Sequence, residues 1–125
     1  MARLSLNILK LPVENLDRAL DYYRDGLGFR LLIRVDEFGW AQLERDGIAL
    51  ALYIPGEGGG DRPPGGSVDF HLVCDNLVDF WRELLGRGLD TGAGIVSGPE
   101  TAAFMDLKDS EGNVLRIIQS DTDSN

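Results

Sequence analysis

The sequence has a single cysteine, Cys74, so no disulfide can form within the chain. One free thiol suits a reducing compartment, and the first apolar stretch is too short for a signal peptide, so we expect a cytoplasmic protein. No run of residues is long and apolar enough to span a membrane. Basic residues are also few, because 12 lysines and arginines accompany 21 aspartates and glutamates, a net charge of −9. This charge repels phosphate backbones and anionic lipid, so neither nucleic acid nor a membrane is an expected partner.

The length limits the domain organisation. A chain of 125 residues with 43% apolar and 26% charged residues has enough apolar surface for one core, so we expect a folded protein. It leaves no room for separate cofactor and substrate domains. We therefore predict a single domain over residues 1–125.

The two halves share one pattern when they are offset by 61 residues, the distance from Asn15 to Asn76. Strand alternation, a helix-capping asparagine and an apolar helix start follow in the same order. The matching residues are Leu9, Leu11, Val13, Asn15 and Leu16 in one half and Phe70, Leu72, Cys74, Asn76 and Leu77 in the other. The pattern predicts an internal duplication with modules 1–63 and 64–125. The Gly/Pro-rich stretch Pro55–Gly66 predicts a flexible linker between them.

Each half is expected to contain a strand, then one helix, and then about three strands. Apolar residues follow helical spacing after each asparagine, namely Leu16, Ala19, Leu20 and Tyr23 in the first half and Leu77, Phe80, Trp81 and Leu84 in the second. Pairs of glycines end both helices. Asp46-Gly47 predicts a hairpin between strands 40–44 and 48–54, and Glu111–Asn113 predicts a turn before the strand 114–118.

The strands present two different faces. In the strand 48–54, Ile48, Leu50, Leu52 and Ile54 alternate with Ala49, Ala51 and Tyr53, and the other strands alternate in a similar way. The aliphatic face is expected to pack on a helix. The other face combines apolar walls with a few polar groups, which fits either a small-molecule cleft or a solvent-exposed sheet surface. We favour the cleft, because exposing Ile8, Trp40, Tyr53 and Ile118 together would cost about 1.5–3 kcal/mol for each large side chain.

Two segments resemble a known family. Val13–Phe29 is similar to the strand-helix signature of the vicinal oxygen chelate superfamily, which includes glyoxalases, bleomycin-resistance proteins and extradiol dioxygenases. Leu107–Ile117 resembles its closing hairpin, with Ser110 where proline is common. The resemblance implies an α+β fold in which two tandem βαβββ modules form a U-shaped mixed sheet around a cleft. It also implies a homodimer, commonly with exchanged modules.

The resemblance gives four positions for metal ligands in the metal-dependent members. Here they are Ile8, Ala51, Asp69 and Arg116, of which only Asp69 can ligate a cation. The single histidine, His71, adds at most a second ligand. We therefore expect no metal and no other cofactor. We also expect Asp69 and Arg116 to form an ion pair in place of the metal.

The first functional hypothesis is a metal-independent protein that binds a small molecule and sequesters a planar cationic antibiotic, as some metal-free members do. Trp40, Tyr53 and Phe104 would be stacking walls, although core packing is the alternative for each of them. Glu44, Asp69 and Asp106 would contact a positive ligand charge. The remaining expected ligand-binding residues are Ile8, Gln42, Ala51, His71 and Arg116.

The alternative is an enzyme in the same cleft, a glyoxalase-like lyase or isomerase or a dioxygenase-type enzyme that acts on a small carbonyl compound. The candidate catalytic residues are His71 as general base and Arg116 as the group that stabilises an oxyanion. Asp69 or Asp106 would orient the histidine. A third hypothesis is a scaffold whose dimer surface is its only binding surface.

Overall fold

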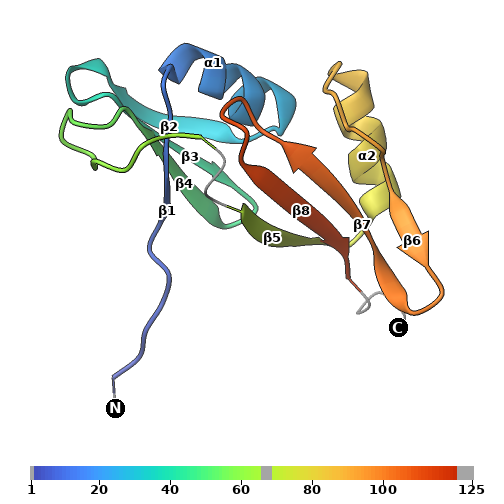
Figure 1. The fold of residues 1–125 in the computed structure, drawn as a ribbon. Coiled ribbons are helices and arrows are strands. Elements are labelled where there is room, and N and C mark those ends of the chain that lie inside the picture. The colour runs from blue at the N-terminus through green and yellow to red at the C-terminus, as the bar shows by residue number, and fades with distance from the viewer. Residues whose placement is uncertain (1, 66–68, 121–125) are drawn as a thin grey trace. The chain divides into compact units, whose positions relative to one another are not determined.

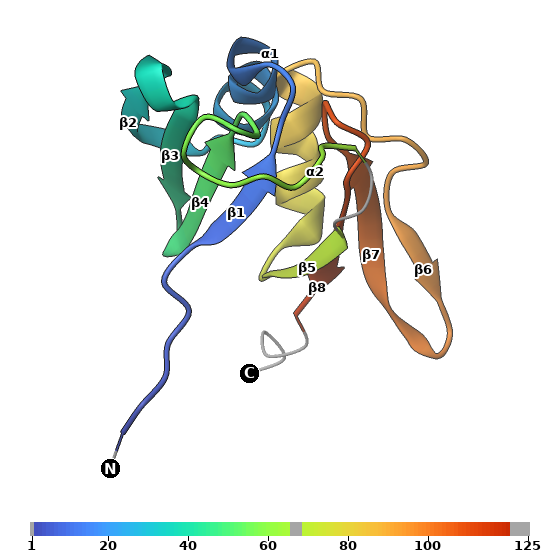
Figure 2. The same cartoon turned by 60° about the vertical axis from the view of Figure 1, so that its left-hand side comes forward.

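Each half of the chain forms one four-stranded mixed sheet with a helix on one of its faces, as Figures 1 and 2 show. This computed structural model describes residues 2–65 and 69–120. By its internal contacts the chain divides into two compact units, residues 1–65 and 66–125. Both units are built from the same order of elements.

The first unit has the strand order β1-β4-β3-β2, with β1 parallel to β4 and the other pairs antiparallel. Its elements are β1 (Leu9–Pro12), α1 (Leu16–Leu20), the π-helical turn η1 (Asp21–Gly26), β2 (Arg30–Val35), the 3-10 turn η2 (Asp36–Phe38), β3 (Trp40–Arg45) and β4 (Ile48–Tyr53). A parallel pair needs a long crossover, and here α1, β2 and β3 fill the crossover between β1 and β4.

The second unit repeats this arrangement with the strand order β5-β8-β7-β6. Its elements are β5 (Asp69–Cys74), α2 (Leu77–Gly86), β6 (Val96–Gly98), β7 (Thr101–Lys108) and β8 (Val114–Gln119). Again the first and last strands are parallel and the others antiparallel. The prediction of an α+β fold with two βαβββ modules is confirmed. The single domain with modules 1–63 and 64–125, and the cleft between the modules, stay predictions.

Asparagine caps start both helices, as the sequence indicates. The Asn15 side chain accepts a hydrogen bond of 3.0 Å from the Arg18 amide, and Asn76 accepts one of 3.1 Å from the Asp79 amide. Each bond satisfies a helix N–H that has no partner within the helix. Within the described residues, no helix is long and apolar enough to cross a bilayer.

The core of each unit lies between its helix and its sheet. The buried sheet residues of the first unit include Leu11, Ala41, Leu43, Leu50 and Leu52, and those of the second include Met105, Leu107, Leu115 and Ile117. Helix α1 contributes Leu16, Ala19 and Leu20, and α2 contributes Leu77 and Leu84. The aliphatic sets of the strands thus face the helices, as predicted.

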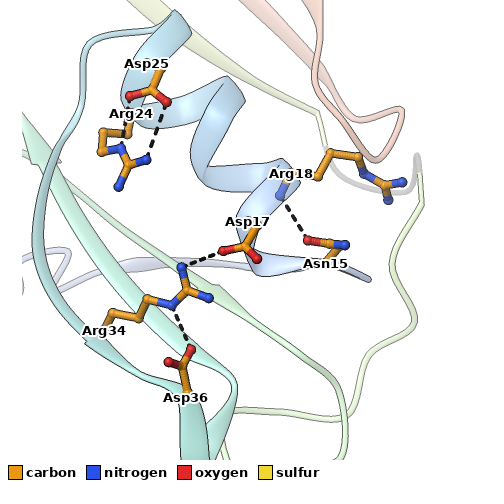
Figure 3. Close-up of polar contacts among 7 residues, drawn as sticks. All are labelled: Asn15, Asp17, Arg18, Arg24, Asp25, Arg34 and Asp36. Atoms are coloured by element: carbon orange, nitrogen blue, oxygen red, sulfur yellow. Dashed lines mark hydrogen bonds and ion pairs between the residues drawn. The ribbon is translucent and has the colours of Figure 1, made fainter.

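An arginine on β2 ties α1 to its sheet. A bulge between Leu31 and Ile33 shifts the register of β2, which places Arg34 opposite Ala41 on the helix-covered face. Its guanidinium donates to Asp17 of α1 at 2.8 Å and to Asp36 at 2.7 Å, as drawn in Figure 3. Without the bulge, Arg34 would lie on the opposite face, because strand side chains alternate.

The two predicted turns are present. Asp46 and Gly47 both have positive φ, 51° and 84°, and connect β3 to β4 in a two-residue hairpin. Between β7 and β8, the Asp109 carboxylate accepts hydrogen bonds from the amides of Glu111 and Asn113 at 2.9 and 2.8 Å. The short acidic and amide side chains of this segment therefore build the turn.

Candidate functional site

Ten of the eleven predicted ligand-binding residues fall on the sheet faces opposite the helices, five in each unit, and the eleventh, Ile8, directly precedes β1. The first unit carries Ile8, Trp40, Gln42, Glu44, Ala51 and Tyr53, and the second carries Asp69, His71, Phe104, Asp106 and Arg116. Within each unit the register shows which of them are neighbours. That the two groups face one common cleft remains a prediction.

In the first unit, β3 and β4 place the predicted residues side by side. Trp40 lies opposite Tyr53, and Gln42 lies opposite Ala51. The parallel partner of Ala51 on β1 is Lys10, whereas Ile8 precedes the strand. Lys10 is therefore the residue of β1 that borders this group.

A glycine loop covers part of this face. Gly56 donates to the Gly60 carbonyl at 2.9 Å, and the Lys10 ammonium donates to the Gly59 carbonyl at 2.6 Å. A Cβ on Gly59 would approach Trp40 and Tyr53 to 2.9 Å, and one on Gly60 would approach the Tyr53 ring to 2.7 Å. Only glycine fits here without displacing the aromatic rings.

This loop corrects the linker prediction for its first part. The segment from Pro55 to Gly60 packs on the sheet instead of forming a free linker, because its glycines allow a close approach to flat rings. Gly66, the end of the predicted linker, lies outside the described residues. Tyr53 is only 3% exposed beneath the loop, so it is closer to a core residue than to an open stacking wall.

Trp40 is half-buried and lines a groove of about 530 Å³. The other lining residues are Lys10, Val35, Phe38, Gly58 and Gly59. Phe38 is 56% exposed, so its ring offers a further aromatic surface at this groove. None of these five residues was predicted to bind ligand. Strand alternation already placed Lys10 on this face, whereas the position of Phe38 depends on the η2 turn.

Glu44, a predicted contact for a positive ligand charge, is engaged within the protein. Its carboxylate accepts a hydrogen bond of 3.1 Å from the Gly47 amide and one of 3.0 Å from Arg30. These two bonds, the backbone one first, lower the pKa of Glu44. The residue thus supports the β3–β4 turn.

In the second unit, Arg116 connects three predicted residues. The ladder places it between His71 on β5 and Asp106 on β7. Its guanidinium forms two hydrogen bonds with Asp106, of 2.8 and 2.9 Å, and stacks on the Phe104 ring at 3.9 Å from the centroid. The bidentate geometry and the aromatic face both suit the planar guanidinium.

The expected partner of Arg116 was wrong. We predicted an ion pair with Asp69, but Asp69 lies opposite Val114, two residues along β8, while Asp106 lies directly opposite Arg116. Asp69 contributes only a charge interaction that favours the protonated arginine. The hydrogen bonds from Arg116 are the largest cause that lowers the pKa of Asp106.

A smaller pocket of about 250 Å³ lies at this group. It is lined by Asp69, His71, Asp106, Val114 and Arg116. His71 is exposed there and contributes to the lowered pKa of Asp106 through its charge. The pocket therefore combines a histidine with a carboxylate–guanidinium pair.

The four positions that the resemblance gives for metal ligands do not fit a divalent cation. Ile8 and Ala51 carry no donor atom, and the Arg116 guanidinium is a permanent cation that is held by Asp106. Among residues 2–65 and 69–120, no three histidine, cysteine or acidic side chains gather closely enough to hold a metal. We therefore derive no chemistry through a metal ion.

Comparisons with known proteins identify the family. A family model described as the Glyoxalase/Bleomycin resistance protein/Dioxygenase superfamily matches residues 5–117. The chain belongs to this superfamily. The resemblance seen in the sequence is thereby confirmed. No curated protein matches the chain in sequence.

Solved structures of the superfamily share the fold. The chain is similar to a bleomycin-binding protein complexed with bleomycin, with a TM-score of 0.71, 23% identity and coverage of 94% of this chain and 100% of that chain. It is also similar to TnmS3, an antibiotic binding protein from Streptomyces sp. CB03234. The TM-score is 0.70, the identity is 24%, and the match covers 95% of this chain and 98% of that chain. A lactoylglutathione lyase from Agrobacterium tumefaciens is similar with a TM-score of 0.74 and 14% identity, over 95% of this chain and 96% of that chain. These identities establish a common fold, and both binding proteins and an enzyme adopt it.

Proposed function

We propose that the chain binds a flat aromatic small molecule and sequesters it without chemical change and without a metal ion. The observation that carries this proposal is the groove beside Trp40. It offers the half-buried indole and the exposed Phe38 ring next to two glycines that add no side chains. Aromatic surfaces of this kind favour planar rings, through offset stacking or edge-to-face contact.

The charged groups narrow the ligand class. We expected three acidic residues to contact a cationic ligand, but Glu44 is bonded to Arg30 and Asp106 to Arg116. Lys10 adds a positive charge at the rim of the groove. None of the three acidic residues lines the groove, so flatness rather than positive charge is the ligand property that the groove favours. A planar antibiotic belongs to this class, and two similar structures are described as binding bleomycin or an antibiotic.

Metal independence is supported by the donor set. Two of the four positions where metal-dependent members hold their ion have aliphatic side chains here, and a third has a guanidinium. A site without converging oxygen or imidazole donors cannot replace the water ligands that a divalent cation would lose on binding. Binding by stacking needs no such ion.

Tryptophan fluorescence tests the proposal, because the chain has only two tryptophans, Trp40 and Trp81. Trp81 donates a hydrogen bond to Thr91 and packs against Gly94, so Trp81→Phe removes its emission without touching the groove. In this variant we expect stoichiometric quenching of Trp40 by bleomycin or another planar drug. The quenching should persist in excess EDTA, and mass spectrometry should recover the drug unchanged. A matched Trp40→Leu variant should lose affinity for the same drug, measured by calorimetry.

Two results would overturn the proposal. One is unchanged Trp40 emission and no calorimetric heat across a panel of planar cationic, neutral and anionic compounds. The other is binding that disappears with EDTA and returns when a divalent ion is added.

A second candidate function rests on the pocket at His71. An imidazole next to a carboxylate–guanidinium pair has the groups for proton abstraction beside a carbonyl, with Arg116 near the developing oxyanion. Turnover of small carbonyl compounds that His71→Ala abolishes, while binding remains, would support the enzyme. The same variant should leave sequestration by the Trp40 groove unaffected.

A further inference from the structure

The groove beside Trp40 has a cation in its lining. Among the described residues, its lining consists of one lysine, aromatic and aliphatic side chains and two glycines, namely Lys10, Val35, Phe38, Trp40, Gly58 and Gly59. No acidic side chain belongs to this set. A molecule that lies flat on the aromatic rings therefore meets an ammonium as the ionisable group of the groove.

The strand register places this ammonium next to the rings. Lys10 lies opposite Ala51 on β4, and Tyr53, two residues further along β4, lies opposite Trp40. Side chains two residues apart on neighbouring strands point to the same face of the sheet. The Lys10 ammonium lies 5.4 Å from the centroid of the Tyr53 ring. A ligand stacked on Trp40 is therefore within reach of this ammonium.

The glycine loop fixes the ammonium in its place. Lys10 donates a hydrogen bond of 2.6 Å to the Gly59 carbonyl, and the loop is closed by the bond of 2.9 Å from the Gly56 amide to the Gly60 carbonyl. Gly59 itself packs on the rings of Trp40 and Tyr53. The charge is therefore held in position before a ligand arrives, which lowers the entropy lost on binding.

The charge of Lys10 is not neutralised by its protein contacts. Arg30 in the same unit is paired with the carboxylate of Glu44, whereas the hydrogen-bond acceptor of Lys10 is a neutral carbonyl. Within residues 2–65 and 69–120, no carboxylate lies at ion-pair distance from Lys10. An ammonium has three N–H donors, so Lys10 keeps both its charge and donors for a ligand.

The acidic residue of the glycine loop does not change this arrangement. The Glu57 carboxylate lies beside Gly39, where a Cβ would approach its Oε1 to 3.1 Å, and Glu57 does not line the groove. The net charge of −9 opposes an anionic ligand at long range. Charges separated by more than about 8 Å are, however, largely screened at physiological ionic strength, so the cation in direct contact has the larger effect.

These features determine which ligand charge suits the groove. A ring that stacks on Trp40 displaces water from the neighbouring ammonium, and this loss is offset only when the ligand supplies a hydrogen-bond acceptor. A carboxylate or phenolate oxygen forms a charge-assisted hydrogen bond, which is stronger than a bond to a neutral acceptor. A cationic substituent would instead bring two like charges together.

We propose that the groove binds planar aromatic anions, with the ring against Trp40 and Phe38 and the anionic oxygen on the Lys10 ammonium. This inference rests on the proposed function and names the ligand class of the same groove. It makes Lys10 the residue that determines which ligand charge is preferred.

Three compounds with one ring system test the charge preference by calorimetry. They are 2-naphthoate, the neutral 2-naphthamide and protonated 2-naphthylmethylamine. For the intact chain we expect 2-naphthoate to bind roughly tenfold more tightly than 2-naphthamide, and the ammonium compound to bind most weakly. Equal affinities, or tightest binding of the ammonium compound, would overturn the inference and leave binding in the groove established.

Variants of Lys10 test whether this residue is the cause. Lys10→Gln keeps a donor for the Gly59 carbonyl but removes the charge, so we expect the preference for 2-naphthoate to disappear while the affinity for 2-naphthamide is unchanged. Lys10→Arg should retain the preference. The matched control is Arg24→Gln, which removes one positive charge from the helical side of the same unit, where Arg24 is paired with Asp25. This control should bind all three compounds like the intact chain.

Two further outcomes separate this inference from the proposed function. A preference for 2-naphthoate that persists in Lys10→Gln would overturn the role of Lys10. If none of the three compounds binds, the inference is wrong, whereas the proposed function fails only if the wider panel of planar compounds also leaves Trp40 unchanged.

Discussion

Arg116 and Asp106 lie directly opposite each other on β8 and β7 and share two hydrogen bonds of 2.8 and 2.9 Å. The same guanidinium stacks on Phe104. The pair lies on the sheet face opposite α2. Arg116 stands at one of the four positions that the resemblance gives for metal ligands in the metal-dependent members. The properties of the pair can be measured on each partner separately.

The carboxylate of Asp106 should respond to the loss of Arg116. In Arg116→Gln we expect the pKa of Asp106 to rise toward its ordinary value, because the hydrogen bonds from the arginine are the main cause of its lowered value. Carboxyl carbon NMR titration measures this directly. An unchanged Asp106 pKa in this variant would show that Arg116 is not the main cause of the lowered value.

The same pair makes a small contribution to stability that depends on pH. Because the pKa of Asp106 is lower in the folded than in the unfolded state, the contribution is present above the unfolded value. It is lost as the pH falls through the folded value. Both side chains are about 40% exposed, so solvent screens the pair and we expect the contribution to be small. Urea unfolding of the wild-type chain and Arg116→Gln at neutral and acidic pH should show the difference shrinking in acid.

Glu44 should behave differently from Asp106. Its lowered pKa depends first on the Gly47 amide and only then on Arg30. We therefore expect Arg30→Gln to raise the pKa of Glu44 only part of the way to its ordinary value, since the backbone bond remains. NMR titration of both carboxylates in the two arginine variants makes the comparison. Full recovery in Arg30→Gln would show that the turn amide contributes little.

The glycine loop should tolerate no side chain at Gly60. A Cβ there would lie 2.7 Å from the Tyr53 ring, so Gly60→Ala is expected to destabilise the fold by about 1–3 kcal/mol. Gly86→Ala is the control, because nothing lies within 4 Å of its added methyl group and alanine favours a helix. Thermal unfolding compares the two. An unchanged midpoint for Gly60→Ala would mean that the loop does not pack on Tyr53.

The turn between β7 and β8 should depend on Asp109. This buried carboxylate accepts the Glu111 and Asn113 amides, so Asp109→Ala leaves two N–H groups without their acceptor. We expect a loss of about 1–3 kcal/mol in urea unfolding. Ser110→Ala in the same turn should cost much less, because the Ser110 hydroxyl makes only a long bond of 3.4 Å to Glu111.

Local signals were sufficient to predict the repeated order of strands and helices. Asn15 and Asn76 cap the two helices, and Asp46-Gly47 closes the hairpin, because capping and turn formation involve residues that are near in the sequence. Strand alternation likewise separates the helix-covered face from the other face. Helix caps, tight turns and strand alternation depend only on residues that are close together in the sequence, so each can be predicted from its own segment.

The pairing of side chains across the sheets was decided by the tertiary structure. Arg116 is bonded to Asp106 and not to Asp69, because the registers of β8 with β7 and β5 set which residues lie opposite each other. Local sequence does not fix these registers. The glycines of Pro55–Gly60 are compatible with a free linker or with close packing, and only their contacts with Trp40 and Tyr53 distinguish the two. The sequence by itself thus determined which elements form and which faces they present, while the alignment of distant strands decided which groups meet.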